Sequence, residues 1–161
     1  DAKYFGKNGG DLGGNGSRMV FFPKGRWVRY SQTKLANAVF TSCLHQKLTK
    51  VNSPIKAIVA HPGLSVTDLQ STTIKDGGMK KWSTELLMRA GQTQEDGAIG
   101  IIKAMADPLQ QSGSFIGPGS GMMAMKGPVI SFPIEKRCYD KDMQSLLWDY
   151  SCNAIEEDFI I

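Results

Sequence analysis

Cysteine is scarce in this sequence, and long apolar runs are missing from it. The 161 residues include three cysteines, Cys43, Cys138 and Cys152, an odd number with no spacing typical of a metal site. We therefore expect free thiols and a reducing compartment, either the cytoplasm or an organelle, and no metal. No run reaches the roughly 20 apolar residues that a transmembrane helix needs, so we expect no membrane span.

The sequence also has only a small excess of positive charge. The formal net charge of +4 arises from 19 basic and 15 acidic residues, and the basic residues are scattered along the chain. Nucleic-acid binding proteins usually gather basic residues into a patch or stripe, so we expect no nucleic-acid partner. The length and the mixed composition are typical of one globular domain.

The chain divides into a loop and a segment with regular patterns. Residues 1–25 are rich in glycine and weakly periodic, which predicts a loop. Apolar spacing then predicts helices over residues 27–48, 79–90, 94–106 and 140–154. Thr93 and Asp96 fit a cap at the start of the third helix. The last helix follows a stretch up to residue 132 that is rich in turn residues.

Short apolar runs over 55–60 and 115–116 predict two strands, the first typical of a central parallel strand buried on both faces. This order of elements predicts half of an α/β sandwich. Two parallel strands cannot bury their own faces, so either the fold is minimal or further strands belong beside them.

Tyr30 and Lys34 carry the chemistry that the sequence suggests. They stand four positions apart on the long helix, so their side chains project from one face, one turn apart. A nearby ammonium favours the phenolate form of a tyrosine, which helps that tyrosine to exchange a proton near neutral pH. Many helices carry this pair by chance, so the spacing alone is weak evidence.

The surrounding residues resemble the carboxyl-terminal half of the short-chain dehydrogenase/reductase family, in its retinol-dehydrogenase-like and protochlorophyllide-reductase-like branch. Residues 30–37 (YSQTKLAN) resemble the active-site helix of that family. The resemblance continues in order through residues 61–67 (HPGLSVT), 94–98 (QEDGA), 114–118 (SFIGP) and 147–151 (LWDYS). It covers nearly the whole chain from residue 27 onward.

The resemblance implies a Rossmann-like, doubly wound parallel sheet, of which residues 1–161 form the carboxyl-terminal portion of a single domain. It implies an oxidoreductase that transfers a hydride between NADP or NAD and a carbonyl, alcohol or activated double bond. Tyr30 would exchange the proton, and Lys34 would assist it and hold the cofactor ribose. Pro62, Gly63 and Thr67 would form the turn that closes over the nicotinamide, although proline and glycine also punctuate ordinary strand ends.

Several parts of that family are not found in this sequence. They are the glycine-rich pyrophosphate turn, the residue that selects the cofactor and the Asn-Asn-Ala-Gly strand end. We do not interpret the glycines of residues 9–16 as a phosphate loop, because no apolar strand precedes them. Residues 1–6 (DAKYFG) resemble the segment just after the catalytic serine in this branch, so we expect that serine upstream, and the chain alone to be inactive.

Four further residues are placed outside the predicted site. His61 and His45 are interpreted as structural. Asn37, two turns after Tyr30, is interpreted as a packing or capping contact rather than the catalytic asparagine of the family. Ser17 lies within the glycine-rich loop rather than after a strand, so it is not assigned as the catalytic serine.

The substrate and the partners are less constrained. A set of flexible apolar residues lies where this family places its substrate lid: Met79, Trp82, Leu86, Leu87 and Met88. Such residues suit a small lipophilic substrate such as a retinoid, steroid, fatty aldehyde or tetrapyrrole. The same residues also fit the core face of an amphipathic helix. Val39, Cys43 and Leu44 could likewise form a homodimer face or complete the core.

The sequence leaves two other functions open. The chain could be a catalytically incomplete structural subunit of a larger assembly, which would explain the missing cofactor half. It could also be a module that binds a lipid surface through the lid helix.

Overall fold

The computed structural model describes residues 24–67, 74–75, 81–89, 91–120, 125–157 and 161. The predicted loop over residues 1–25, Ser17 included, lies almost wholly outside these ranges. The elements are, in chain order, α1 (Lys24–Lys50), β1 (Val59–Ala60), α3 (Lys81–Arg89), α4 (Gln94–Ala106), β2 (Ser114–Ser120), β3 (Lys126–Pro133), the short 3-10 helix η4 (Lys136–Tyr139) and α5 (Lys141–Ile155).

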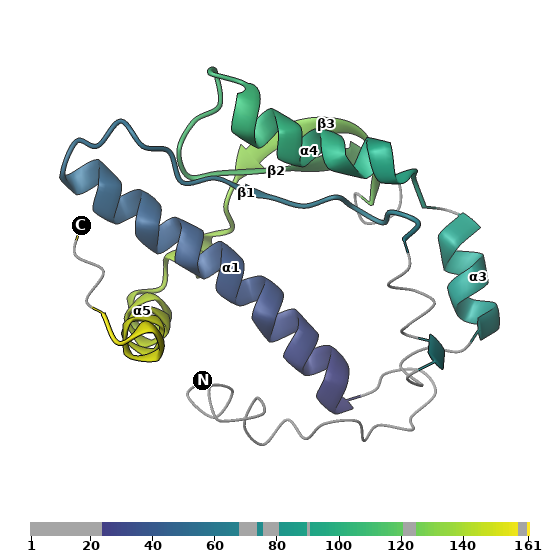
Figure 1. Cartoon of the computed structure of the whole chain (residues 1–161), viewed down its shortest axis with the longest axis horizontal. Coiled ribbons are helices and arrows are strands. Elements are labelled where there is room, and N and C mark those ends of the chain that lie inside the picture. Colours follow the sequence, from purple (N-terminus) through teal and green to yellow (C-terminus); the bar gives the residue numbers. More distant parts are fainter. Residues whose placement is uncertain (1–23, 68–73, 76–80, 90, 121–124, 158–160) are drawn as a thin grey trace.

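The described sheet has three strands in the order β1-β2-β3. β1 pairs parallel with β2, and β2 pairs antiparallel with β3. α1 and α4 lie on opposite faces of this sheet, and α5 packs beside α1 (Figure 1). The protein is therefore a small α/β protein with a mixed sheet and one parallel pair.

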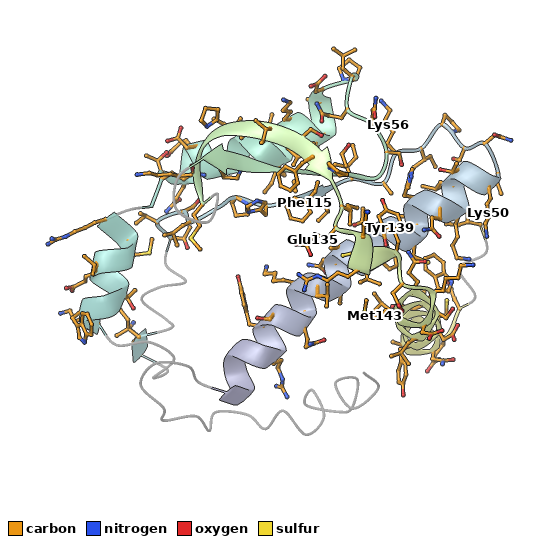
Figure 2. All side chains as sticks on the ribbon, turned by 180° about the vertical axis from the view of Figure 1, so that it is seen from behind. Lys50, Lys56, Phe115, Glu135, Tyr139 and Met143 are labelled. Atoms are coloured by element: carbon orange, nitrogen blue, oxygen red, sulfur yellow. The ribbon has the colours of Figure 1, made fainter. Side chains whose placement is uncertain are left out.

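The main core lies where α1 meets the sheet, η4 and α5. Its buried centre consists of Ala38, Val39, Ile134 and Cys138. Figure 2 marks Phe115, Tyr139 and Met143, which pack against this centre from β2, η4 and α5. Val39 and Cys43 are buried within the chain, so these two complete the core rather than offer a dimer face, whereas Leu44 is half-buried.

A buried polar contact joins three elements of this core. The Gln144 Nε2 atom of α5 donates to the Ser42 Oγ atom of α1 at 2.9 Å and to the Cys138 carbonyl at 3.1 Å. The Ser42 hydroxyl in turn donates to the same Cys138 carbonyl. Because each buried polar group finds a partner, the contact fixes η4 between the two helices.

All three cysteines are free, as the sequence predicted. Burial raises the pKa of the Cys43 and Cys138 thiols, which keeps them protonated and unreactive at neutral pH.

The predicted strand over residues 55–60 is only partly correct. Val59 and Ala60 pair with Phe115 and Ile116, which confirms the parallel pair. Before them, the Ala57 N–H donates to the Ser112 side chain at 3.0 Å, so a side chain replaces part of the strand ladder. β1 also lies at one edge of the described sheet rather than at its centre, and Val59 is only half-buried.

The turn-rich prediction up to residue 132 was wrong, because this stretch contains β3. β3 holds Gly127 and Pro128, two residues that usually mark turns. Proline has no backbone N–H, and strands tolerate it at a sheet edge, which is where β3 lies in the described sheet. The stacked rings of Phe115 and Phe132, 5.0 Å apart, hold β3 against β2.

The four predicted helices are all present, with ends that differ by up to three residues. The Asp96 N–H donates to the Thr93 side chain at 3.1 Å, which confirms the predicted cap of α4. None of the helices in the described part of the chain is long and apolar enough to cross a membrane.

Candidate functional site

Tyr30 and Lys34 lie together on the exposed face of α1. The Lys34 Nζ atom is 5.4 Å from the centre of the Tyr30 ring. Tyr30 is 46% exposed, and Lys34 is also exposed, so both groups are open to a ligand. The helix places them one turn apart, as the sequence predicted.

The segment that follows β1 forms a second part of the candidate site. Its turn contains Pro62 and Gly63, and Gly63 adopts a φ of +64°, a backbone conformation that favours glycine. A Cβ atom on Gly63 would lie 2.3 Å from the Met125 carbonyl oxygen and 2.6 Å from the Pro118 ring. Glycine is therefore required here by close packing against the β2-β3 connection, a structural reason that does not involve a cofactor.

Each of the two parts lies close in sequence to a residue that packs against the core. Leu35 directly follows Lys34, and Val59 lies three residues before Pro62. Both side chains pack against the same buried cluster. The pair on α1 and the carboxyl-terminal end of β1 therefore belong to one structural unit. Thr67, the last predicted cofactor contact, is exposed and lies five residues after Pro62.

Gln92 holds this turn in place, and sequence reasoning missed it. Its side-chain Nε2 atom donates to the Pro62 carbonyl at 2.7 Å, and its Oε1 atom accepts from the Gly127 N–H at 3.2 Å. Its backbone N–H donates to the Leu64 carbonyl, and its carbonyl accepts the Val66 N–H. These two hydrogen bonds lie on either side of the Ser65-Gln92 bridge. A single glutamine thus joins the turn, the start of α4 and β3. Because the two side-chain contacts span 30 residues or more, no local motif reveals them.

Replacing Gln92 by leucine is expected to lower the free energy of unfolding by about 1–3 kcal/mol, since two hydrogen bonds worth about 0.5–1.5 kcal/mol each are lost. Thermal unfolding of the purified protein measures this change. Gln94→Leu, at an exposed glutamine two positions along the chain, should change the free energy by less than about 0.5 kcal/mol. Equal effects of the two substitutions would refute the role given to Gln92.

Both histidines make contacts within the fold. The His45 Nδ1 atom lies 2.9 Å from the Ser112 hydroxyl, which also accepts the Ala57 N–H. The His61 ring packs against Phe115, with 5.1 Å between ring centres, and covers the Gly117 backbone so closely that a Cβ on that glycine would lie 2.1 Å from Nε2. Its Nδ1 atom accepts the Gly63 N–H at 3.1 Å.

His61 makes the stability of the turn depend on pH. Burial lowers the pKa of its imidazole, and the Gly63 N–H bond also needs an unprotonated Nδ1 atom. The unfolded chain therefore binds a proton before the folded chain does. The contribution of neutral His61 is complete above the ordinary histidine pKa of about 6.5 and is lost as the pH falls below it.

We expect the Tm of the protein to fall more steeply between neutral and mildly acidic pH than the Tm of a His61→Asn variant. The asparagine oxygen can still accept a hydrogen bond but does not titrate. Scanning calorimetry across this range measures both slopes. Parallel slopes would show that His61 does not carry the pH dependence.

Two other predictions concern residues around the site. Trp82 and Leu86 of α3 are 60% and 62% exposed, so they do not form the core face of an amphipathic helix. Met88 is half-buried, while Met79 and the side chain of Leu87 lie outside the described residues. Asn37 is exposed, so the packing contact expected for it is not seen; its carbonyl accepts the Thr41 hydroxyl at 2.9 Å.

A hollow of about 980 Å³ lies beside the start of α4. It is lined by Val66, the first turn of α4 and the start of β3, and it does not include Tyr30 or Lys34. Among the described residues, no three His, Cys, Asp or Glu side chains gather as ligands of a metal ion would.

Comparison with solved structures finds a similar fold in a crystal structure of an uncharacterized protein from Mycobacterium paratuberculosis. The TM-score is 0.57 at 30% sequence identity, over 84% of this chain and 41% of that chain. This chain therefore spans less than half the length of that protein. No family model matches the sequence, and no curated protein matches it.

Proposed function

We propose that this chain is the carboxyl-terminal portion of an NAD(P)-dependent short-chain dehydrogenase/reductase that acts on a small lipophilic substrate. One observation carries the proposal. An exposed phenol and an exposed ammonium, Tyr30 and Lys34, lie side by side on one face of α1, with 5.4 Å between the Lys34 Nζ atom and the ring centre. A proton-transfer pair needs this proximity together with access for substrate.

The fold supports the proposal in two ways. The parallel β1-β2 pair, with α1 and α4 on opposite faces, has the layer order of a doubly wound α/β domain. The match to 41% of a longer solved protein also fits a chain that represents part of such a domain.

In this proposal Tyr30 gives or takes the proton at the substrate oxygen or carbon. Lys34 places a positive charge beside the Tyr30 ring and would donate hydrogen bonds to ribose hydroxyls, a role for which its exposed ammonium is suited. A nicotinamide cofactor, when bound, supplies or accepts the hydride. The turn at Pro62, which Gln92 holds, would contact the nicotinamide. The exposed Trp82 and Leu86 of α3 offer an apolar surface to the substrate.

The test uses the full-length protein that contains this chain. We expect hydride transfer from NADPH or NADH to at least one member of a panel of retinoid, steroid and fatty carbonyls. The loss of nicotinamide absorbance measures this transfer. The 161 residues alone should be inactive. If the full-length protein bound neither nicotinamide by calorimetry, the chain would instead be a structural subunit of an assembly.

A further inference from the structure

The end of the molecule where α1 and α4 terminate exposes lysines and large aliphatic side chains together. α1 ends at Lys50, and the loop that follows it meets the turn after α4, where the Lys56 Nζ atom donates to the Pro108 carbonyl at 2.6 Å. Figure 2 marks Lys50 and Lys56 at this end. We call this surface the basic edge, and its members are Lys50, Val51, Ile55, Lys56, Met105 and Leu109.

The aliphatic members of the basic edge project into solvent. Val51 and Ile55 are 55% and 64% exposed, and Met105 and Leu109 are 83% and 85% exposed. Lys56 and Met105 line one hollow of about 520 Å³, which brings the loop after α1 and the end of α4 onto one surface. Single exposed apolar side chains are normal, but a group of large ones marks a surface that binds a partner.

Hydrogen bonds hold this loop in place. The Ser53 N–H donates to the Leu48 carbonyl at 2.9 Å, and the Ile55 N–H donates to the Ser53 hydroxyl at 3.3 Å. At the far end of the loop, the Ala57 N–H donates to the Ser112 hydroxyl at 3.0 Å. The exposed side chains are therefore positioned before a partner arrives, which lowers the entropic cost of binding.

Positive charge dominates the basic edge. No aspartate or glutamate occurs in the sequence from residue 12 to residue 67, and Asp107 is the only one from residue 97 to residue 113. The Asp107 carboxylate lies near Lys56 and Lys103, and it accepts hydrogen bonds from the Leu109 N–H at 2.9 Å and the Gln110 Nε2 atom at 2.6 Å. One acid, bonded within its own turn, leaves the lysines in excess.

We propose that the basic edge binds the surface of an anionic lipid bilayer. The lysine ammonium groups contact headgroup phosphates, and the aliphatic side chains enter the boundary between headgroups and acyl chains. Lysine suits this position, because its apolar stem can follow the aliphatic groups while its ammonium stays among the headgroups. The proposal is independent of the proposed enzyme activity, because it uses neither Tyr30 nor Lys34, and it does not involve α3.

Two other classes of partner fit this surface less well. Protein interfaces are depleted in lysine, whereas here Lys50 and Lys56 stand directly beside Val51 and Ile55. A nucleic acid would pair with the lysines through its phosphates, but it would leave the aliphatic side chains without an apolar environment. A bilayer surface offers both anionic groups and an apolar layer.

The first test measures sedimentation of the full-length protein with lipid vesicles. Vesicles of phosphatidylserine and phosphatidylcholine in equal parts should pellet the protein, and vesicles of phosphatidylcholine alone should not. Lys50→Gln combined with Lys56→Gln should weaken binding by about 25-fold, because each lysine near an anionic surface contributes about fivefold. Failure to pellet, or equal pelleting by the two kinds of vesicle, would overturn the proposal.

Lys136→Gln combined with Lys141→Gln is the matched control. Both lysines are exposed, lie outside the basic edge, and remove the same net charge when replaced. Because salt screens charges far from the bilayer, this variant should lose less than about twofold. Equal losses in the two double variants would show that net charge, rather than the basic edge, governs binding. If the first double variant melts below the wild type, Lys50→Gln alone should still lose about fivefold.

The second test separates a bilayer from a soluble anion. Ile55→Ser should weaken vesicle binding by at least about threefold, because it removes apolar surface that enters the bilayer. Ile155→Ser, at a residue 58% exposed against 64% for Ile55, should leave binding unchanged. Equal affinities of the two variants would assign the surface to a soluble polyanion. Inorganic phosphate should release the protein no better than sodium chloride at equal ionic strength, and stronger release would indicate a site for free phosphate instead.

Discussion

Tyr30→Phe in the full-length protein is expected to lower kcat by about 10²- to 10⁴-fold, the range that a positioned proton-transfer group supplies. The substitution removes one hydroxyl and keeps the ring that faces the Lys34 ammonium. Because Tyr30 is 46% exposed, loss of its hydroxyl should affect the fold little. Substrate binding should therefore change much less than turnover, and steady-state kinetics separates the two.

Tyr150→Phe is the matched control for this prediction. Tyr150 is 39% exposed on α5, far along the chain from the proposed pair, and its loss of a hydroxyl should leave kcat unchanged. Turnover by Tyr30→Phe equal to that of the wild type would remove Tyr30 from the mechanism. The Lys34→Met variant should also lose turnover and should bind the nicotinamide cofactor more weakly, since both functions are proposed for the ammonium.

Gly63→Ala is expected to destabilise the protein by about 2–5 kcal/mol. A side chain at a left-handed φ costs about 1–2 kcal/mol, and forcing a methyl group into packed atoms adds about 1–3 kcal/mol. The packed atoms here are the Met125 carbonyl oxygen at 2.3 Å and the Pro118 ring at 2.6 Å. For a chain of this size the Tm should fall by several degrees or more, measured by calorimetry.

Gly100→Ala provides a control with the same chemical change and the opposite expected sign. Gly100 lies within α4, and a Cβ atom there would be 3.4 Å from its nearest neighbour, the His61 carbonyl oxygen, an ordinary contact. Alanine is favoured over glycine in a helix by about 1 kcal/mol. The Tm should therefore stay the same or rise. A similar decrease in Tm in both variants would mean that the turn has no special requirement for glycine at position 63.

The elements that the sequence predicted best are those set by local interactions. Apolar periodicity located the long helix α1, and the Thr93 side chain, which accepts a hydrogen bond from the Asp96 N–H, marked the start of α4. The one-turn spacing of Tyr30 and Lys34 follows from helical geometry alone, which is why the structure brings them together as expected.

β3 and Gln92 show where sequence reasoning failed. Gly127 and Pro128 indicate a turn when read locally, but the hydrogen bonds and ring contacts of β2 hold the segment as a strand. Gln92 has no distinguishing sequence context, and its importance arises from Pro62 and Gly127, each 30 or more residues away.

Taken by itself, the sequence determined the helices, the parallel pair, the free thiols and the proximity of Tyr30 to Lys34, because each of these depends on neighbouring residues or on composition. Tertiary structure alone decided that Val39 belongs to the core, that Gly63 must lack a side chain and that the outer face of α4 is exposed. These features depend on which surfaces meet when distant segments pack, and the periodicity of one segment carries no information about the surface that will cover it.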